Sequence, residues 1–270
     1  MNILFIGDIV GKPGRRAVRE LLPRIVAGHG VDFVIANCEN AAGGFGVTRE
    51  VVAELFDRKI DVLTSGNHIW DKKEVYEFID AFDNLLRPAN YPEGAPGIGS
   101  AVAKTADGRT VGVLNLEGRV FMRPIECPFR AARREIEILK EKTRIIIVDF
   151  HGEATSEKLA MGWFLDGDVT AVIGTHTHVQ TADERILPGG TAYISDAGMT
   201  GPHDSVIGVR KEIVIEKFLT GLPARFDPAK GDVFLQGVLI SVDEKSGKGT
   251  AIRRVSEPLD PSGGTRGGNL

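Results

Sequence analysis

Side chains that can bind a metal or move a proton follow five short apolar runs of the chain. They are Asp8, Glu39 and Asn40, Asn67 and His68, His151, and His176 and His178. Carboxylate, amide and imidazole groups gathered in one place are typical of a site for two divalent metal ions. The chemistry of such a site is metal-assisted hydrolysis, in which a neighbouring side chain that does not bind the metals moves protons.

The apolar runs that precede these side chains have the length and composition of buried β-strands. They span residues 2–6, 31–36, 60–65, 144–148 and 169–173, and they are apolar on both alternating positions. Strands of this kind belong to parallel sheets that are covered on both faces, and such sheets bind ligands beyond the carboxyl ends of their strands. We therefore expect the five groups of side chains to meet at one edge.

Two of the groups are chemically informative by themselves. Glu39 follows a buried strand, where a carboxylate is a poor core residue but a good ligand for bridging two cations. Asn67 offers an oxygen ligand without adding charge, and His68 then lies beside the metals, free to donate a proton. A buried, hydrogen-bonded histidine next to a turn-forming asparagine is the alternative interpretation.

The remaining groups are weaker evidence when each is taken alone. His176 and His178 are two positions apart, so on an extended segment their imidazoles share a face. Such a doublet is common in zinc and iron sites but also occurs by chance. Asp8 fits a helix cap as well as a metal ligand, and His151 stands alone. Together, however, five such groups at five strand ends predict a metal site.

Composition and charge restrict the class of protein. The chain has 270 residues, 42% of them hydrophobic and 26% charged, which predicts a sizeable core in one large domain or two small ones. A net charge of −4 gives no basic field for stable binding of nucleic acid. The two cysteines make no disulfide framework, and no run approaches the length of a membrane span. We expect a cytoplasmic protein, and the sequence leaves a homo-oligomer open.

Helices and strands alternate along much of the chain. Apolar spacing predicts helices near residues 13–27, 48–59, 73–81, 130–142 and 156–164. Further strands near 100–103, 110–116 and 191–195 and a hairpin of 233–242 with 250–255 add antiparallel pairs. This mixture predicts an α/β fold with two mixed sheets and helices outside, a four-layer α/β/β/α sandwich, in preference to one long Rossmann sheet. We expect a domain at residues 1–257 and a disordered tail at 258–270.

The order of these motifs resembles the calcineurin-like metallophosphoesterase superfamily. The segments Gly7-Asp-Ile-Val-Gly-Lys-Pro-Gly-Arg15, Asn37-Cys-Glu-Asn40, Gly66-Asn-His-Ile-Trp-Asp71 and Gly198-Met-Thr-Gly-Pro202 are more specific. They resemble the bacterial YmdB-like family of 2′,3′-cyclic-nucleotide 2′-phosphodiesterases, to about Val255. The chain departs from the wider superfamily at Val10, where a histidine is usual, and at Glu39, where an aspartate is usual. Both departures are those of the YmdB-like branch.

The resemblance implies a metallophosphoesterase domain with a defined set of roles. One metal is held by Asp8, Glu39, Asn40 and His178, and the other by Glu39, Asn67, His151 and His176, with His68 as the proton donor. The metals implied are two transition or divalent ions, iron first and manganese second. The implied reaction is hydrolysis of a small cyclic nucleotide, 2′,3′-cyclic to 3′-nucleotide, by metal-bound hydroxide.

Several other activities fit part of the pattern. A 3′,5′-cyclic nucleotide phosphodiesterase, a phosphomonoesterase or a protein phosphatase would use the same metals, although the last two usually need more basic side chains to bind a dianion. An amidohydrolase-type enzyme carries His-x-His after its first strand, whereas here the doublet comes late. A nucleotide-sensing regulator with slow turnover is the alternative from another class, and His68 argues against it because pure binding needs no proton donor.

Overall fold

Strand β1 (Asn2–Ile6) shows why the apolar runs have no polar face. The structure is a computed structural model that describes residues 1–260. Ile3 and Phe5 belong to a core that lies between two sheets, whereas Leu4 and Ile6 belong to a second core beneath helices. Because successive side chains of a strand point to opposite faces, a strand with a core on each side must be apolar throughout.

Two mixed sheets pack against each other. In the first, the order is β2 (Asp8–Ile9), β11 (Met199–Pro202), β12 (Val233–Asp243), β1, β3 (Phe33–Asn37) and β4 (Val62–Thr64), with β13 (Lys248–Pro258) paired to β12. In the second, the order is β5 (Ser100–Lys104), β6 (Thr110–Glu117), β7 (Ile146–His151), β8 (Ala171–Thr175), β10 (Ala192–Ile194) and β9 (Arg185–Ile186). The strands that lead to the chemical side chains run parallel within each sheet, β1 with β3 and β4, and β7 with β8.

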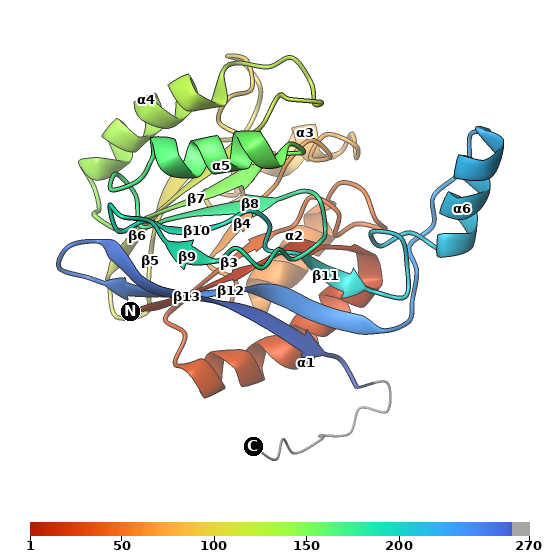
Figure 1. Ribbon diagram of the computed structural model, residues 1–270, viewed down its shortest axis with the longest axis horizontal. Helices are drawn as coiled ribbons and strands as arrows, with labels where there is room; N and C mark the ends of the chain where they lie inside the picture. The colour runs from red at the N-terminus through yellow and green to blue at the C-terminus, as the bar shows by residue number, and fades with distance from the viewer. Residues whose placement is uncertain (261–270) are drawn as a thin grey trace.

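Helices cover the outer face of each sheet (Figure 1). Helices α1 (Gly11–His29) and α2 (Arg49–Asp57) pack on the first sheet, and α4 (Pro128–Lys140) and α5 (Thr155–Phe164) pack on the second. The predicted third helix is shorter, α3 (Val75–Phe78) followed by a 3-10 turn at Ile79–Ala81. The prediction of two mixed sheets inside two helical layers is confirmed.

Two segments differ from the sequence-based expectation. Helix α6 (Lys211–Thr220) was not predicted and extends away from the sheets (Figure 1). At the other end, β13 extends through Pro258 and Leu259 is buried, just past the expected domain boundary at residue 257. Residues 261–270 of the predicted tail lie outside the described residues.

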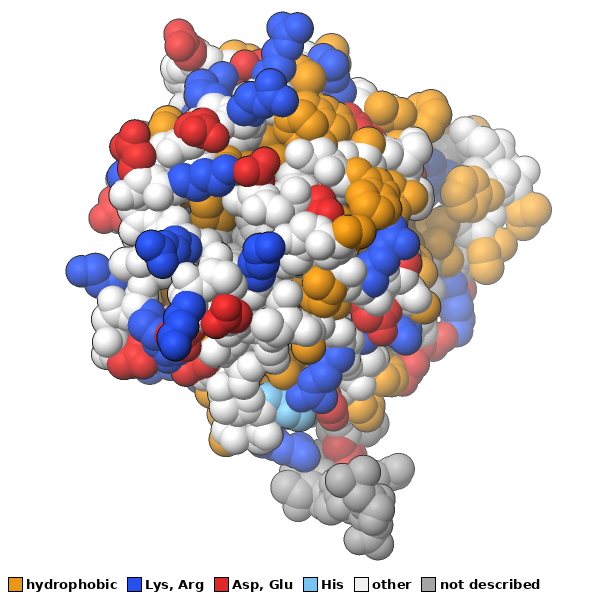
Figure 2. Space-filling view, turned by 60° about the vertical axis from the view of Figure 1, so that its left-hand side comes forward, with side chains coloured by type: hydrophobic (Ala, Val, Ile, Leu, Met, Phe, Trp, Pro, Cys, Tyr) orange, Lys and Arg blue, Asp and Glu red, His pale blue; other side chains and the backbone are white. Residues whose placement is uncertain are grey.

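The surface carries charges of both signs. On the face shown in Figure 2, Lys and Arg side chains alternate with Asp and Glu, and no large area of one sign is visible there. Among the described residues, no helix combines the length and the apolar character that crossing a membrane requires.

Candidate metal centre

The carboxyl ends of strands from both sheets bring the predicted side chains together. Ligand atoms of Glu39, His151 and His176 lie within 4.8 Å of one another, and so do those of Asp8, Glu39 and His178. Glu39 belongs to both groups, and its carboxylate is fully buried. The arrangement therefore has the form of two adjoining cation sites with one shared carboxylate.

The two histidines that follow β8 each present a defined nitrogen to the cluster. His178 Nδ1 lies 2.9 Å from the carbonyl oxygen of Ile207, which can only accept, so its Nε2 carries the lone pair. His176 Nε2 lies 3.0 Å from the carboxylate of Glu153, so its Nδ1 faces inward, 3.0 Å from His151. Partners of this kind fix the tautomer of a metal-binding imidazole.

His151 is oriented from behind by a chain of hydrogen bonds. The hydroxyl of Thr175 donates to Asp149 Oδ1 at 2.7 Å and therefore accepts from His151 Nδ1 at 2.9 Å. The second oxygen of Asp149 accepts from the Thr64 hydroxyl at 2.5 Å and from the Asn37 amide at 3.1 Å. This chain leaves the Nε2 lone pair of His151 pointing at the cluster.

Lone pairs converge on one point from four residues. His151 Nε2 lies 3.0 Å from His176 Nδ1, 3.1 Å from Asn67 Oδ1 and 3.2 Å from Glu39 Oε1. With neutral imidazoles oriented as above, all four atoms are acceptors and none supplies a hydrogen. A cation between them would satisfy all four, so these residues fit a metal ion.

Unpaired oxygens mark the second group. Asp8 Oδ1 and Asn40 Oδ1 are buried and have no hydrogen-bond partner, which costs about 1–3 kcal/mol for each such group. Burial also raises the pKa of Asp8. Although burial opposes a charged imidazole, the carboxylates of Glu39 and Asp8 raise the pKa of His151 to about 9. A cation in the first group would replace the proton of His151, and a cation in the second group would pair the two oxygens, so both groups fit a metal ion.

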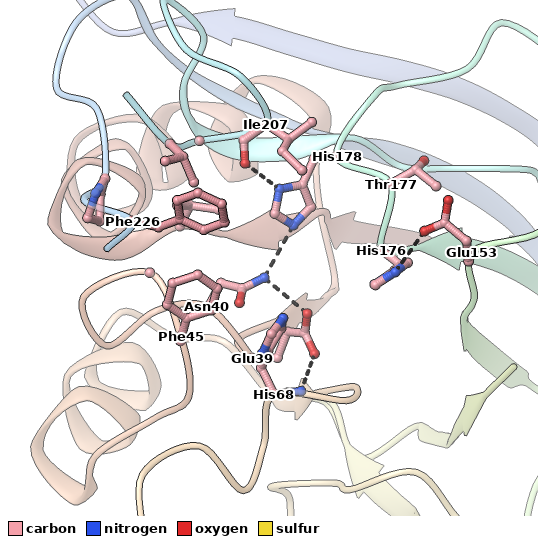
Figure 3. Close-up of a pocket in the computed structure, with 15 residues that line it drawn as sticks. Glu39, Asn40, Phe45, His68, Glu153, His176, Thr177, His178, Ile207 and Phe226 are labelled. Carbon is pink, nitrogen blue, oxygen red and sulfur yellow. Dashed lines mark hydrogen bonds and ion pairs between the residues drawn. The ribbon is translucent and has the colours of Figure 1, made fainter. Parts of the chain in front are cut away.

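His68 lies beside the cluster without joining it (Figure 3). Its backbone N–H donates to Glu39 Oε2 at 3.1 Å, and its ring stands edge-on to Phe45 with the centroids 5.0 Å apart. His68 Nδ1 lies 2.7 Å from the Asp71 carboxylate. Because that carboxylate holds the Nδ1 hydrogen, Nε2 is the nitrogen that remains to exchange a proton in the pocket.

A family model described as YmdB-like protein matches residues 4–255. The chain belongs to the YmdB-like family. The 2′,3′-cyclic-nucleotide 2′-phosphodiesterase of Bacillus subtilis (strain 168) is 51% identical over 255 residues, which are 94% of this chain and 96% of that protein. A putative phosphatase/phosphodiesterase of Mycoplasma pneumoniae is 36% identical over 267 residues, which are 95% of this chain and 94% of that protein.

Solved structures of two similar proteins share the YmdB-like fold. A hypothetical protein from Thermus thermophilus superposes with a TM-score of 0.89 at 41% identity, over 96% of this chain and all of that one. A Mycoplasma pneumoniae protein described as a novel phosphatase gives 0.88 at 34% identity, over 97% of this chain and 95% of that one. The metallophosphoesterase type of sandwich predicted from the sequence is confirmed.

The backbone of the YmdB-like doublet differs from the predicted extended segment. His176 and His178 follow the end of β8 and have φ angles of 98° and 64°, which side-chain-bearing residues rarely adopt. Asp196 holds this turn by accepting from the Thr177 N–H at 3.0 Å and from Lys158 Nζ at 2.8 Å. The two imidazoles therefore converge because the backbone is left-handed, and the prediction that they share one face of a strand is wrong.

Other residues of this YmdB-like chain lie outside or around the cluster. His203, whose role the sequence left open, has Nε2 3.2 Å from the Met199 carbonyl oxygen, and neither it nor Lys12 lines the pocket. Sequence reasoning missed the supporting carboxylates Asp149 and Glu153. Their positions in the sequence were the available signal. Asp149 directly follows the apolar run at residues 144–148, and Glu153 follows His151 by two residues.

Asp149→Asn should weaken metal binding by about 10- to 100-fold, the usual cost of losing an outer partner of a ligating histidine. The amide cannot accept from all of the surrounding donors, so Thr175 no longer holds His151 in place. Competition with a chelator measures the change. The matched control is Asp183→Asn, because that carboxylate accepts from Ser195 outside the cluster. Equal weakening in the two variants would contradict a specific role for Asp149.

Proposed function

We propose that this chain hydrolyses 2′,3′-cyclic nucleotides at the 2′ ester and releases 3′-nucleotides. The observation that carries the proposal is the position of Glu39, which is shared by two groups of metal-ligand atoms and also binds the backbone of His68. The relative from Bacillus subtilis, 51% identical over nearly the whole chain, is named for this activity.

Two metal ions complete the proposed centre. Asp8, Glu39, Asn40 and His178 would hold one ion, and Glu39, Asn67, His151 and His176 would hold the other. When bound, the ions supply positive charge for the phosphoryl oxygens and make a hydroxide nucleophile available at neutral pH. Iron is the metal that we propose, with manganese as the alternative, because both accept mixed oxygen and imidazole ligands.

His68 has the role of general acid. The leaving group of a phosphodiester is an alkoxide, which departs poorly unless it receives a proton. With Nδ1 fixed by Asp71 at 2.7 Å, His68 delivers the proton from Nε2. Phe45 packs on its ring and limits the orientations that the imidazole can adopt. A general acid of this kind contributes typically about 10²–10⁴ in rate.

The pocket favours a substrate with one negative charge. Within the described part of the chain, no Lys or Arg is among the residues that line it. A phosphomonoester dianion lacks the basic partners that it usually requires, whereas a cyclic diester carries a single charge that the metals can neutralise. Of the two cyclic isomers we propose the 2′,3′ form, because its five-membered ring is the more strained and opens more readily.

Incubation with 2′,3′-cyclic AMP in the presence of manganese, or of ferrous iron without oxygen, tests the proposal. We expect adenosine 3′-phosphate as the main product by chromatography and no product with EDTA. Formation of mainly adenosine 2′-phosphate, or faster hydrolysis of 3′,5′-cyclic AMP, would contradict the proposed substrate and leave the metal centre in place.

A further inference from the structure

The pocket in front of the metal centre has two chemically different ends. It encloses about 510 Å³, within the range of about 300–1,000 Å³ that is usual for small-molecule sites. Polar side chains of the metal cluster and His68 form one end. The other end is lined mainly by carbon, with Phe226, Ile207 and Val10 as its larger side chains, and Phe45 lies next to His68 where the two ends meet.

Phe45 and Phe226 reach the pocket from separate loops. Phe45 lies between β3 and α2, flanked by Gly44 and Gly46 with φ angles of 102° and 71°. Phe226 lies in the segment between α6 and β12. In Figure 3, Phe226 stands on the His178 side of Asn40 and Phe45 on the His68 side. Both phenyl rings are half-buried and neither belongs to the three apolar cores of the fold, so core packing does not explain them. Lys217 Nζ lies over the Phe226 ring, 4.5 Å from its centroid.

Polar groups near the apolar end are engaged within the protein. The carbonyl oxygen of Ile207 accepts from His178. The Gly208 N–H donates to Ser205 Oγ, and the Gly208 carbonyl oxygen accepts from the Ala229 N–H, both at 2.9 Å. The side chains are likewise committed. Thr177 donates its hydroxyl to Asp196 at 2.7 Å, and Glu153 pairs with His176. This end can therefore contact the flat face of an apolar group, but it has few free donors or acceptors to form hydrogen bonds with the edge of that group.

We infer that the apolar end is a nucleobase site, in which the base lies against the rings of Phe45 and Phe226 and is held by stacking instead of by hydrogen bonds to its edge. The inference rests on the proposed function, because it needs the cyclic phosphate at the metal centre. Every nucleobase has a flat π-face, so stacking tolerates any base. The enzyme should therefore accept purine and pyrimidine 2′,3′-cyclic nucleotides alike.

The size of the effect follows from the strength of stacking. Base–aromatic stacking corresponds to a preference of about 5- to 150-fold per base. The substrate that isolates it is methyl β-D-ribofuranoside 2′,3′-cyclic phosphate, which keeps the scissile ester and lacks only the base. We expect the intact protein to prefer 2′,3′-cyclic AMP by this factor in kcat/KM, with most of the difference in KM.

Phe226→Ala is the decisive variant, because Phe45 also touches His68 and its loss would disturb the proton donor. We expect Phe226→Ala to lower the preference for 2′,3′-cyclic AMP over the abasic ester several-fold, with the remainder supplied by Phe45, whereas Phe226→Tyr, which retains the ring, should keep it. Phe218→Ala is the matched control, since this phenylalanine is 81% exposed on α6 and lies outside the pocket. The four common 2′,3′-cyclic nucleotides should agree within about tenfold in the intact protein.

Three results would overturn the inference alone while the proposed function stands. They are equal hydrolysis of the nucleotide and the abasic ester by the intact protein, an unchanged preference in Phe226→Ala, or a strong preference for one base. Absence of hydrolysis of both esters in the presence of metal is a different result, because it overturns the proposed function and this inference with it.

Discussion

Glu39→Gln should remove both metal ions from the protein and abolish turnover. The side chain belongs to both groups of ligand atoms, so its loss affects both ions, whereas His151 belongs to one group only. A glutamine side chain is neutral and cannot offset the repulsion between two neighbouring cations. We expect the metal content to fall from about two ions per chain to a small fraction of one. The affinity for metal should fall by more than the roughly 10- to 100-fold that is lost when a hydrogen-bond partner of a metal ligand is replaced.

Elemental analysis after dialysis measures this effect independently of activity. Glu157→Gln is the matched control, because Glu157 is also buried but accepts from the backbone N–H groups of Arg119 and Val120. It should keep both ions. His151→Ala should lose one ion more readily than the other. A Glu39→Gln protein that retains two ions, or an unaltered protein that binds only one, would exclude a shared carboxylate.

The fold was largely predictable because burial on two sides leaves a clear mark in the sequence. Phe33 and Ile35 enter the core between the sheets, while Val34 and Ala36 enter the core beneath the helices, so the whole segment is apolar. The helix at residues 49–57 was equally predictable from the sequence, because Thr48 is a favourable N-cap residue and accepts from the Val51 N–H in the structure. Such signals are local, and they identify an element without reference to its neighbours.

Residues that act through a distant partner were harder to predict. Nothing near Thr175 in the sequence indicates that its hydroxyl joins Asp149 to His151, because the relation exists only once β7 and β8 pair. The left-handed backbone at His176 and His178 could not be predicted from the local sequence either, because it depends on Asp196, which holds the turn from the end of another strand. The proximity of these side chains was predictable from the strand ends, but their orientation was not.

The apolar wall of the pocket was missed for a related reason. Phe226 follows an unpredicted helix and lies in an exposed stretch rich in proline and charge, where one aromatic residue carries no periodic signal. Phe45 sits among glycines, which identify a loop but not the direction in which the ring points. The three-dimensional approach of these two loops is what places both residues on the wall of one pocket.

His68→Ala should lower kcat on 2′,3′-cyclic AMP by about 10²–10⁴ while the metal content stays unchanged. The imidazole donates no ligand atom to either group, and its link to the cluster is the backbone N–H, which alanine retains. What the variant loses is the proton for the departing 2′ oxygen. On bis-p-nitrophenyl phosphate the loss should be much smaller, because nitrophenolate leaves without protonation.

The contrast between the two substrates separates proton donation from structure. Asp71→Asn should shift both rates in the same direction as His68→Ala but less, because the amide oxygen can still accept from His68 Nδ1 and so retains part of the orientation of the ring. His203→Ala is the matched control, since that histidine lies outside the pocket and should leave both rates near those of the intact protein. If His68→Ala lost equal activity on both esters, the imidazole would be positioning the substrate or the metals. If it lost activity only where the leaving group is an alkoxide, proton transfer to that oxygen is the step that the residue performs.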